Sequence, residues 1–77
     1  MKSQIQLKLF ATLQEFTPPS ADNFIIDQGT SIHDLLDQID MPREKAKLIF
    51  INGVKAELTT VLEGGERVGI FPPVGGG

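Results

Sequence analysis

The chain has 77 residues, no cysteine and a formal net charge of -3. This length predicts a single domain, and the lack of cysteine excludes disulfides, thiolate metal sites and a cysteine nucleophile. The acidic balance and the scattered Lys and Arg residues provide no basic patch for phosphate backbones, so we expect no nucleic-acid partner.

The first predicted element is a strand over residues 5–11. The residues before it contain no apolar run, so we expect no membrane segment and a cytoplasmic location. Apolar and polar residues alternate along this strand, which places one set toward the core: Ile5, Leu7, Leu9 and Ala11. Phe10 is out of phase with that set, so we expect it on the opposite face. Pro18 and Pro19 then indicate a loop.

A second strand and a helix come next. Residues 23–27 contain a short apolar run that fits a strand returning beside the first as a hairpin. Thr30 or Ser31 can cap a helix, with Asp34 in its first turn, and Pro42 marks the helix end. The apolar positions of this helix recur at helical spacing: Ile32, Leu35, Leu36 and Ile39.

The rest of the chain predicts three more strands. Residues 48–51 read as a buried strand, and Asn52-Gly53 is a tight-turn signal. A minor strand follows over residues 54–58, and the last strand covers residues 67–71. In this last strand Phe71 is out of phase with the two core-facing residues, which are Val68 and Ile70.

The order of these elements predicts an α+β fold of the ubiquitin-like β-grasp type. In this fold type a mixed sheet is covered by one main helix, and the first and last strands lie side by side and parallel at the sheet centre. We expect a β-grasp domain over residues 1–71 and a flexible C-terminal tail over residues 72–77.

The tail reads Pro72-Pro73-Val74-Gly75-Gly76-Gly77. The two prolines favour an extended exit from the sheet, and the glycines can enter a channel that rejects side chains. Six residues reach at most about 20 Å, which is enough to enter the active site of another protein. We therefore expect residues 72–76 to insert into a partner. The alternative is a disordered end without a role.

The expected working group is the α-carboxylate of Gly77. A carboxylate is a poor electrophile until one oxygen becomes a leaving group, so activation has to come from a partner enzyme. Adenylation by ATP followed by attack of a sulfur nucleophile would give a thiocarboxylate. Attack by a lysine amine would instead give an isopeptide, as in a ubiquitin-like modifier, and the sequence leaves both outcomes open.

Phe10 and Phe71 are the candidates for partner docking. If their strands are neighbours, the two rings form an apolar patch at the base of the tail. The alternative is that the loop at Pro18 and Pro19 covers one of the rings.

No metal site, bound cofactor or intrinsic catalytic set is predicted. His33 has no second histidine or cysteine to complete a metal site. The carboxylates along the predicted helix lie off its apolar stripe, where solvation is the simplest expectation: Asp34, Asp37 and Asp40.

Four segments stand out: Leu-Phe-Ala-Thr-Leu-Gln-Glu at 9–15, Ile-Asn-Gly at 51–53, Leu-Glu-Gly-Gly-Glu-Arg-Val at 62–68 and Phe-Pro-Pro-Val-Gly-Gly-Gly at 71–77. They resemble the MoaD/ThiS family of sulfur carriers, which includes the small subunit of molybdopterin synthase. The resemblance implies that a ubiquitin-activating-like adenylyltransferase uses ATP to activate Gly77. It also implies that a sulfurtransferase system supplies the sulfur and that the thiocarboxylate donates it to a biosynthetic intermediate.

The run from Phe71 to Val74 is more similar to the molybdopterin branch of that family than to the thiamine branch. This resemblance implies a role in molybdenum cofactor biosynthesis and a molybdopterin synthase large subunit as a further partner. The alternatives are a sulfur carrier for the thiamine thiazole, a protein modifier, and a β-grasp interaction module whose tail is incidental.

Overall fold

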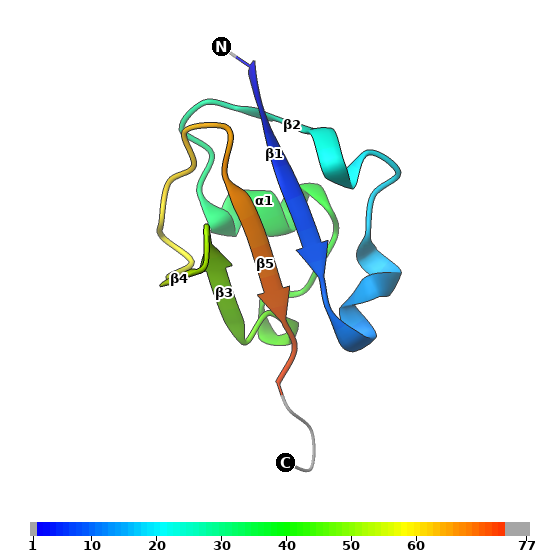
Figure 1. Cartoon of the computed structure of the whole chain (residues 1–77). Helices are drawn as coiled ribbons and strands as arrows, with labels where there is room; N and C mark the ends of the chain where they lie inside the picture. Colours follow the sequence, from blue (N-terminus) through cyan, green and yellow to red (C-terminus); the bar gives the residue numbers. More distant parts are fainter. Residues whose placement is uncertain (1, 74–77) are drawn as a thin grey trace.

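The computed structural model describes residues 2–73, which form a five-stranded sheet with one α-helix on one of its faces (Figure 1). The helix is α1 (Ile32–Gln38), and the strands are β1 (Lys2–Leu9), β2 (Phe24–Asp27), β3 (Leu48–Ile51), β4 (Val54–Ala56) and β5 (Arg67–Phe71). Three short 3-10 helices lie in the connections: η1 (Ala11–Phe16), η2 (Ala21–Asn23) and η3 (Arg43–Lys45).

The sheet has the order β2-β1-β5-β3-β4 and confirms the predicted β-grasp fold. Its two central strands, β1 and β5, are parallel, whereas the other neighbouring strands are antiparallel. Leu7 pairs with Val68 and Leu9 with Ile70, so the two ends of the domain are joined at the sheet centre. The chain leaves the sheet at Phe71, between β1 and β3.

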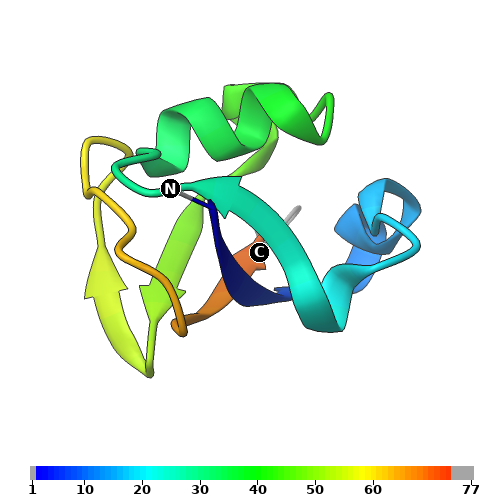
Figure 2. The same ribbon diagram turned by 90° about the horizontal axis from the view of Figure 1, so that it is seen from above.

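The core lies between the sheet and α1, which covers one sheet face (Figure 2). A capping box fixes the start of the helix, as predicted: the Asp34 N–H donates to Ser31 Oγ at 3.1 Å, and the Ser31 N–H donates to Asp34 Oδ2 at 3.4 Å. The predicted apolar stripe of the helix and the predicted core faces of β1 and β5 are all buried: Ile5, Leu7, Leu9, Ile32, Leu35, Leu36, Ile39, Val68 and Ile70.

Three local predictions are wrong. Ala11 is exposed with φ 53°, because the chain turns after β1 and Leu13 of η1 supplies the next core side chain. The helix ends at Gln38 rather than near Pro42, since Asp40 takes a left-handed φ of 58°. In β3 only Ile49 is fully buried: Leu48 and Phe50 face away from α1, and Ile51 packs against the core but is half-buried.

The predicted tight turn between β3 and β4 is confirmed. Asn52 and Gly53 have φ values of 53° and 83°, which are those of a hairpin turn with positive φ at both central positions. Asn52 Oδ1 accepts a hydrogen bond of 2.9 Å from the Arg67 N–H, so the turn is tied to the start of β5. Of the helices within residues 2–73, none has the length and hydrophobicity that crossing a membrane requires.

Candidate docking site on the sheet

The sheet face opposite α1, called the open face below, carries three of the five phenylalanines of the chain. Strand alternation puts the core residues of β1 and β5 toward the helix, so their neighbours point the other way. Figure 1 looks onto this open face, with β1 and β5 in front of α1. Side chains of three strands line a shallow groove of about 520 Å³ there, among them Phe10, Phe50 and Phe71.

These three phenylalanines are called the aromatic cluster below, and Phe71 contacts both of the others. The rings of Phe10 and Phe71 are stacked, with centroids 4.2 Å apart and planes inclined by 1°. Phe50 meets Phe71 edge to face, at 5.6 Å and 86°. Both geometries are favourable for aromatic pairs. The cluster therefore forms one apolar unit across β1, β5 and β3.

Gly69 is the residue of β5 next to the rings of Phe10 and Phe71. It lies on β5 opposite Lys8 and Phe50, in the row that faces away from the helix. A Cβ at Gly69 would stand 3.4 Å from Cε2 of Phe10 and 4.0 Å from Cε1 of Phe71. Both are ordinary van der Waals distances, so a Cβ at this position would contact the two rings without displacing them.

The structure brings the two predicted docking residues together and leaves them accessible. Phe10 is 38% exposed and Phe71 is half-buried. Pro18 and Pro19 line a separate depression beside the opposite edge of β1, so their loop is not among the residues that border the aromatic cluster. That both rings serve as docking residues stays a prediction.

Phe50 was missed by the sequence analysis, which treated its strand as buried. The signal was present, because Phe50 alternates with Ile49 and Ile51 along β3. Its contribution depends on the antiparallel register that places it opposite Gly69, and that pairing is not visible in the sequence.

The aromatic cluster lies next to the point where the tail begins. The Phe71 carbonyl accepts a hydrogen bond of 2.9 Å from the Lys47 N–H, which holds the last residue of β5 in the sheet. Pro72 is half-buried and Pro73 is exposed. The remaining predicted tail residues lie outside the described residues: Val74, Gly75, Gly76 and Gly77.

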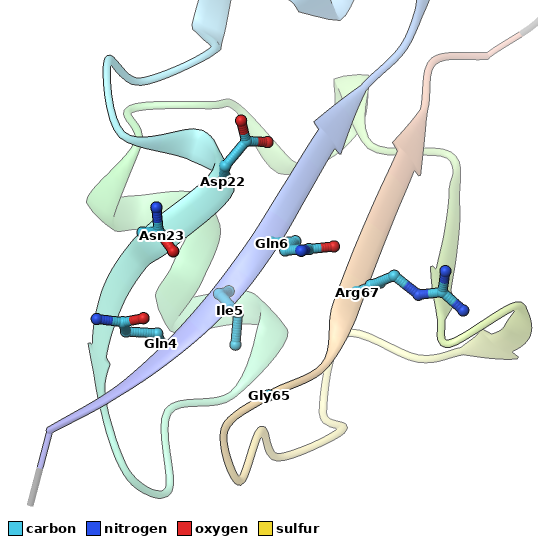
Figure 3. A pocket seen from close by; sticks show the side chains of 7 residues that line it. All are labelled: Gln4, Ile5, Gln6, Asp22, Asn23, Gly65 and Arg67. Carbon is cyan, nitrogen blue, oxygen red and sulfur yellow. The ribbon is translucent and has the colours of Figure 1, made fainter.

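A second depression lies between β1, η2 and the start of β5 (Figure 3). Gln4, Gln6, Asp22 and Asn23 line it with amide and carboxylate groups, whereas the Arg67 side chain extends away from β1 (Figure 3). This set contains no nucleophile paired with a base. Within residues 2–73, every buried side-chain nitrogen or oxygen has a hydrogen-bond partner, so no orphaned polar group marks a ligand site there.

The first turns of α1 bring one histidine and two carboxylates close together. Ligand atoms of His33, Asp34 and Asp37 lie within 4.8 Å of one another, and His33 Nδ1 is 4.0 Å from an oxygen of each carboxylate. Both aspartates are exposed, as the sequence analysis expected of residues off the apolar stripe. Exposed acidic groups of this kind are common without a metal ion.

Comparisons with known proteins agree with this geometry. The model of the ThiS family matches residues 7–77. No curated protein matches the chain.

Similar solved structures include three archaeal proteins. The HVO 2177 protein of Haloferax volcanii has 22% identity and a TM-score of 0.76 over 99% of this chain and 88% of its own. A Pyrococcus furiosus protein provisionally named molybdopterin converting factor subunit 1 has 25% identity and a TM-score of 0.64 over 94% of this chain and 99% of its own. The small archaeal modifier protein 1 of Methanosarcina acetivorans has 25% identity and a TM-score of 0.67 over 100% of this chain and 99% of its own.

Proposed function

Since this chain belongs to the ThiS family, we propose that it carries sulfur as a thiocarboxylate on Gly77. At the level of the family, it is a small ubiquitin-fold protein of the sulfur-carrier and modifier type. The observation that carries the proposal is that the family match extends through Gly77, beyond the strand that ends beside the aromatic cluster.

The proposed chemistry takes place in a partner enzyme. An oxygen of the Gly77 carboxylate attacks the α-phosphorus of ATP, and pyrophosphate leaves. Hydrosulfide supplied by a sulfurtransferase system then attacks the acyl carbon of the adenylate, and AMP leaves with the original carboxylate oxygen. The S–H proton passes to solvent, which leaves the thiocarboxylate on Gly77. The chain itself supplies the acyl group and the docking surface, so we propose that it is a cosubstrate without catalytic residues or a bound cofactor.

We place this sulfur transfer in molybdopterin biosynthesis. Two observations support the choice: the run from Phe71 to Val74, which resembles the molybdopterin branch, and the similarity to the Pyrococcus furiosus protein named as a converting factor subunit. The molybdopterin synthase large subunit is then the proposed acceptor of the loaded chain. A sulfur carrier for the thiamine thiazole is the alternative within the same chemistry.

A second function is conjugation to other proteins. The similarity to the small archaeal modifier protein 1 of Methanosarcina acetivorans favours it. The activation step is the same, but a lysine amine replaces sulfur as the nucleophile and an isopeptide bond forms. Conjugates on other proteins, found under conditions that load Gly77, would favour this function over sulfur transfer.

The proposed function predicts a mass change on the carrier. We expect the intact protein purified from cells to contain a fraction that is heavier by the difference between one sulfur and one oxygen atom. Fragmentation should place the added mass on Gly77. Incubation with purified adenylyltransferase, ATP and a sulfur source should increase this fraction, and a mass that stays unchanged in both experiments would contradict the proposal.

The aromatic cluster predicts a docking defect that leaves the fold intact. Truncating Phe10 to alanine removes an exposed ring and its stack on Phe71, and central aromatic truncations cost about 2 kcal/mol in binding, or roughly thirtyfold in affinity. We expect Phe10→Ala to raise the KM of the adenylyltransferase for this chain by that order.

The matched control is Val61→Ala, which removes a side chain that is 52% exposed and lies outside the aromatic groove. It should leave KM within about twofold of the wild-type value, as expected for a surface substitution away from the interface. Equal KM values for the two variants would show that the cluster is not the docking site. Thermal unfolding of both variants checks that the domain is intact.

A further inference from the structure

Charge is divided unevenly between the sheet and the rest of the chain. The basic residues on strands are Lys2, Lys8, Lys55 and Arg67, and the only acidic strand residue in the described chain is Asp27. All seventeen charged residues lie within residues 2–73, seven basic and ten acidic. The strands thus carry four positive charges and one negative charge, for a net charge of +3. The helices and connections carry three positive charges and nine negative charges, for a net charge of -6.

The strand charges lie on the open face. Each basic strand residue is exposed. It alternates along its strand with residues that point toward α1, so its own side chain points to the open face. Lys2 Nζ is 2.8 Å from Asp27 Oδ1, so these two charges neutralise each other. This hydrogen bond and the nearby Lys2 charge hold the pKa of the Asp27 carboxyl below its ordinary value. The unneutralised charge of the face therefore comes from the other three basic residues.

Lys8, Lys55 and Arg67 lie beside the aromatic cluster and are called the basic ring below. Lys8 and Arg67 line the same groove as the cluster, and Lys55 pairs with Phe50 across the β3–β4 hairpin. Arg67 extends its side chain away from β1, toward the side of the β3–β4 hairpin (Figure 3). None of the three forms an ion pair within the described residues.

Glu66, which precedes Arg67 in the sequence, directs its carboxylate to backbone N–H groups. Glu66 accepts hydrogen bonds of 2.7 Å from the N–H groups of Glu63 and Gly64, one on each carboxylate oxygen. Its charge thus stabilises the turn before β5 and leaves the Arg67 guanidinium available. Within residues 2–73 the basic ring has no ion-pair partner, so its three charges are available to carboxylates of a partner protein.

On the basis of the proposed function, we propose that the open face docks on an acidic surface of the enzyme that activates Gly77. That surface has an apolar centre, which receives the aromatic cluster, and a rim of carboxylates opposite the basic ring. Charges at an interface rim act mainly on association rate and specificity, while the buried aromatic centre supplies affinity. Because the strands carry a net charge of +3 and the helices and connections a net charge of -6, the electrostatic attraction of such a surface is strongest for the sheet.

A protein partner fits this face better than a nucleic acid. Basic sheet faces with exposed aromatics also bind single strands, by stacking bases on the rings. Here Phe10 and Phe71 stack on each other at 4.2 Å, so the facing sides of the two rings cannot receive bases. The net charge of -3 also opposes binding to a polyanion at long range.

The test compares two charge reversals that change the net charge equally. Arg67→Glu alters the basic ring, and Arg43→Glu alters an exposed residue of η3; each takes the net charge from -3 to -5. The probe is the purified ubiquitin-activating-like adenylyltransferase of the same organism, with ATP. The readouts are the KM for the carrier at low and high NaCl and the thermal unfolding of each variant.

We expect Arg67→Glu to raise KM by roughly tenfold at low salt, with a smaller effect on kcat, and Arg43→Glu to change KM by less than about twofold. The wild-type KM should rise with NaCl, and the Arg67→Glu value should depend on salt much less, since the attractive charge is gone. Lys8→Glu serves as a second ring variant should Arg67→Glu unfold.

Other results overturn the inference in distinguishable ways. Equal KM values for Arg67→Glu and Arg43→Glu, with the wild type loaded normally, would overturn the acidic docking surface and leave the proposed function standing. Failure of the enzyme to load the wild-type chain would overturn the proposed function and the inference together. Binding of a fluorescent oligouridine that is lost in Arg67→Glu, without a change in loading, would assign the face to nucleic acid instead.

Discussion

Deleting Gly77 is expected to abolish sulfur loading and leave the domain folded. The deletion moves the terminal carboxylate back by one residue, or about 3.3 to 3.6 Å, relative to a carrier docked on its sheet. A misplacement of about 1 Å in an active site can cost a hundredfold in rate, so a loss of at least that size is expected. The measurement is the rate of thiocarboxylate formation with purified adenylyltransferase, ATP and a sulfur source.

Two controls separate lost chemistry from a lost fold. The buried core of the described chain lies between Ile5 and Ile70, so thermal unfolding of the shortened chain should match that of the wild type. Docking should also persist, because the aromatic cluster is unchanged, and the shortened chain should compete with the wild type for the enzyme. Normal loading of the shortened chain would refute the proposed role of Gly77.

Replacing Ile70 by alanine is expected to cause the largest loss of stability among the substitutions considered. Ile70 is 0% exposed and pairs with Leu9 on one side and Ile49 on the other. Truncation of a buried isoleucine to alanine costs about 2 to 5 kcal/mol, because the apolar contacts are lost and a cavity remains. A domain of this size has a free energy of unfolding of about 4 to 12 kcal/mol, so the variant loses much of its stability.

Ile25→Ala is the matched control, since it makes the same chemical change in another strand. Ile25 is 47% exposed on β2, so its truncation should cost about 1 kcal/mol or less. Denaturant unfolding of both variants measures the difference directly. Similar losses for the two substitutions would mean that the packing between the central strands and α1 does not dominate stability.

The Ile70 prediction also bears on function. Ile70 and Phe71 are neighbours in β5 and point to opposite faces, so the same strand fills the core and presents the aromatic cluster. Loosening the core beneath β5 therefore disturbs the docking surface as well. KM can be measured at temperatures where Ile70→Ala remains folded. If this KM is closer to the wild-type value than the KM of Phe10→Ala, then Ile70 acts mainly on stability and Phe10 mainly on docking.

Much of the fold was predictable because it depends on local patterns. The alternation in β1 and β5, the helical spacing from Ile32 to Ile39 and the Asn52-Gly53 turn each indicate a conformation within a few residues. Local errors arose where a contact distant in the sequence decided the outcome. The sequence pattern predicted that the strand continues and that Ala11 lies in the core. In the structure the chain turns at Ala11 and Leu13 of η1 is buried instead, which the spacing of apolar residues does not predict.

The sequence by itself determined the strand and helix faces and the composition of the tail, because side-chain period and backbone restriction are local properties. The prediction that Gly77 carries the chemistry also comes from sequence, and the described residues do not extend to it. Only the tertiary structure decided that Phe50 joins Phe10 and Phe71, and that Lys8, Lys55 and Arg67 lie beside them. The physical reason is strand pairing: the register between β1, β5, β3 and β4 sets which distant side chains become neighbours, and hydrogen bonds between strands far apart in the chain establish that register.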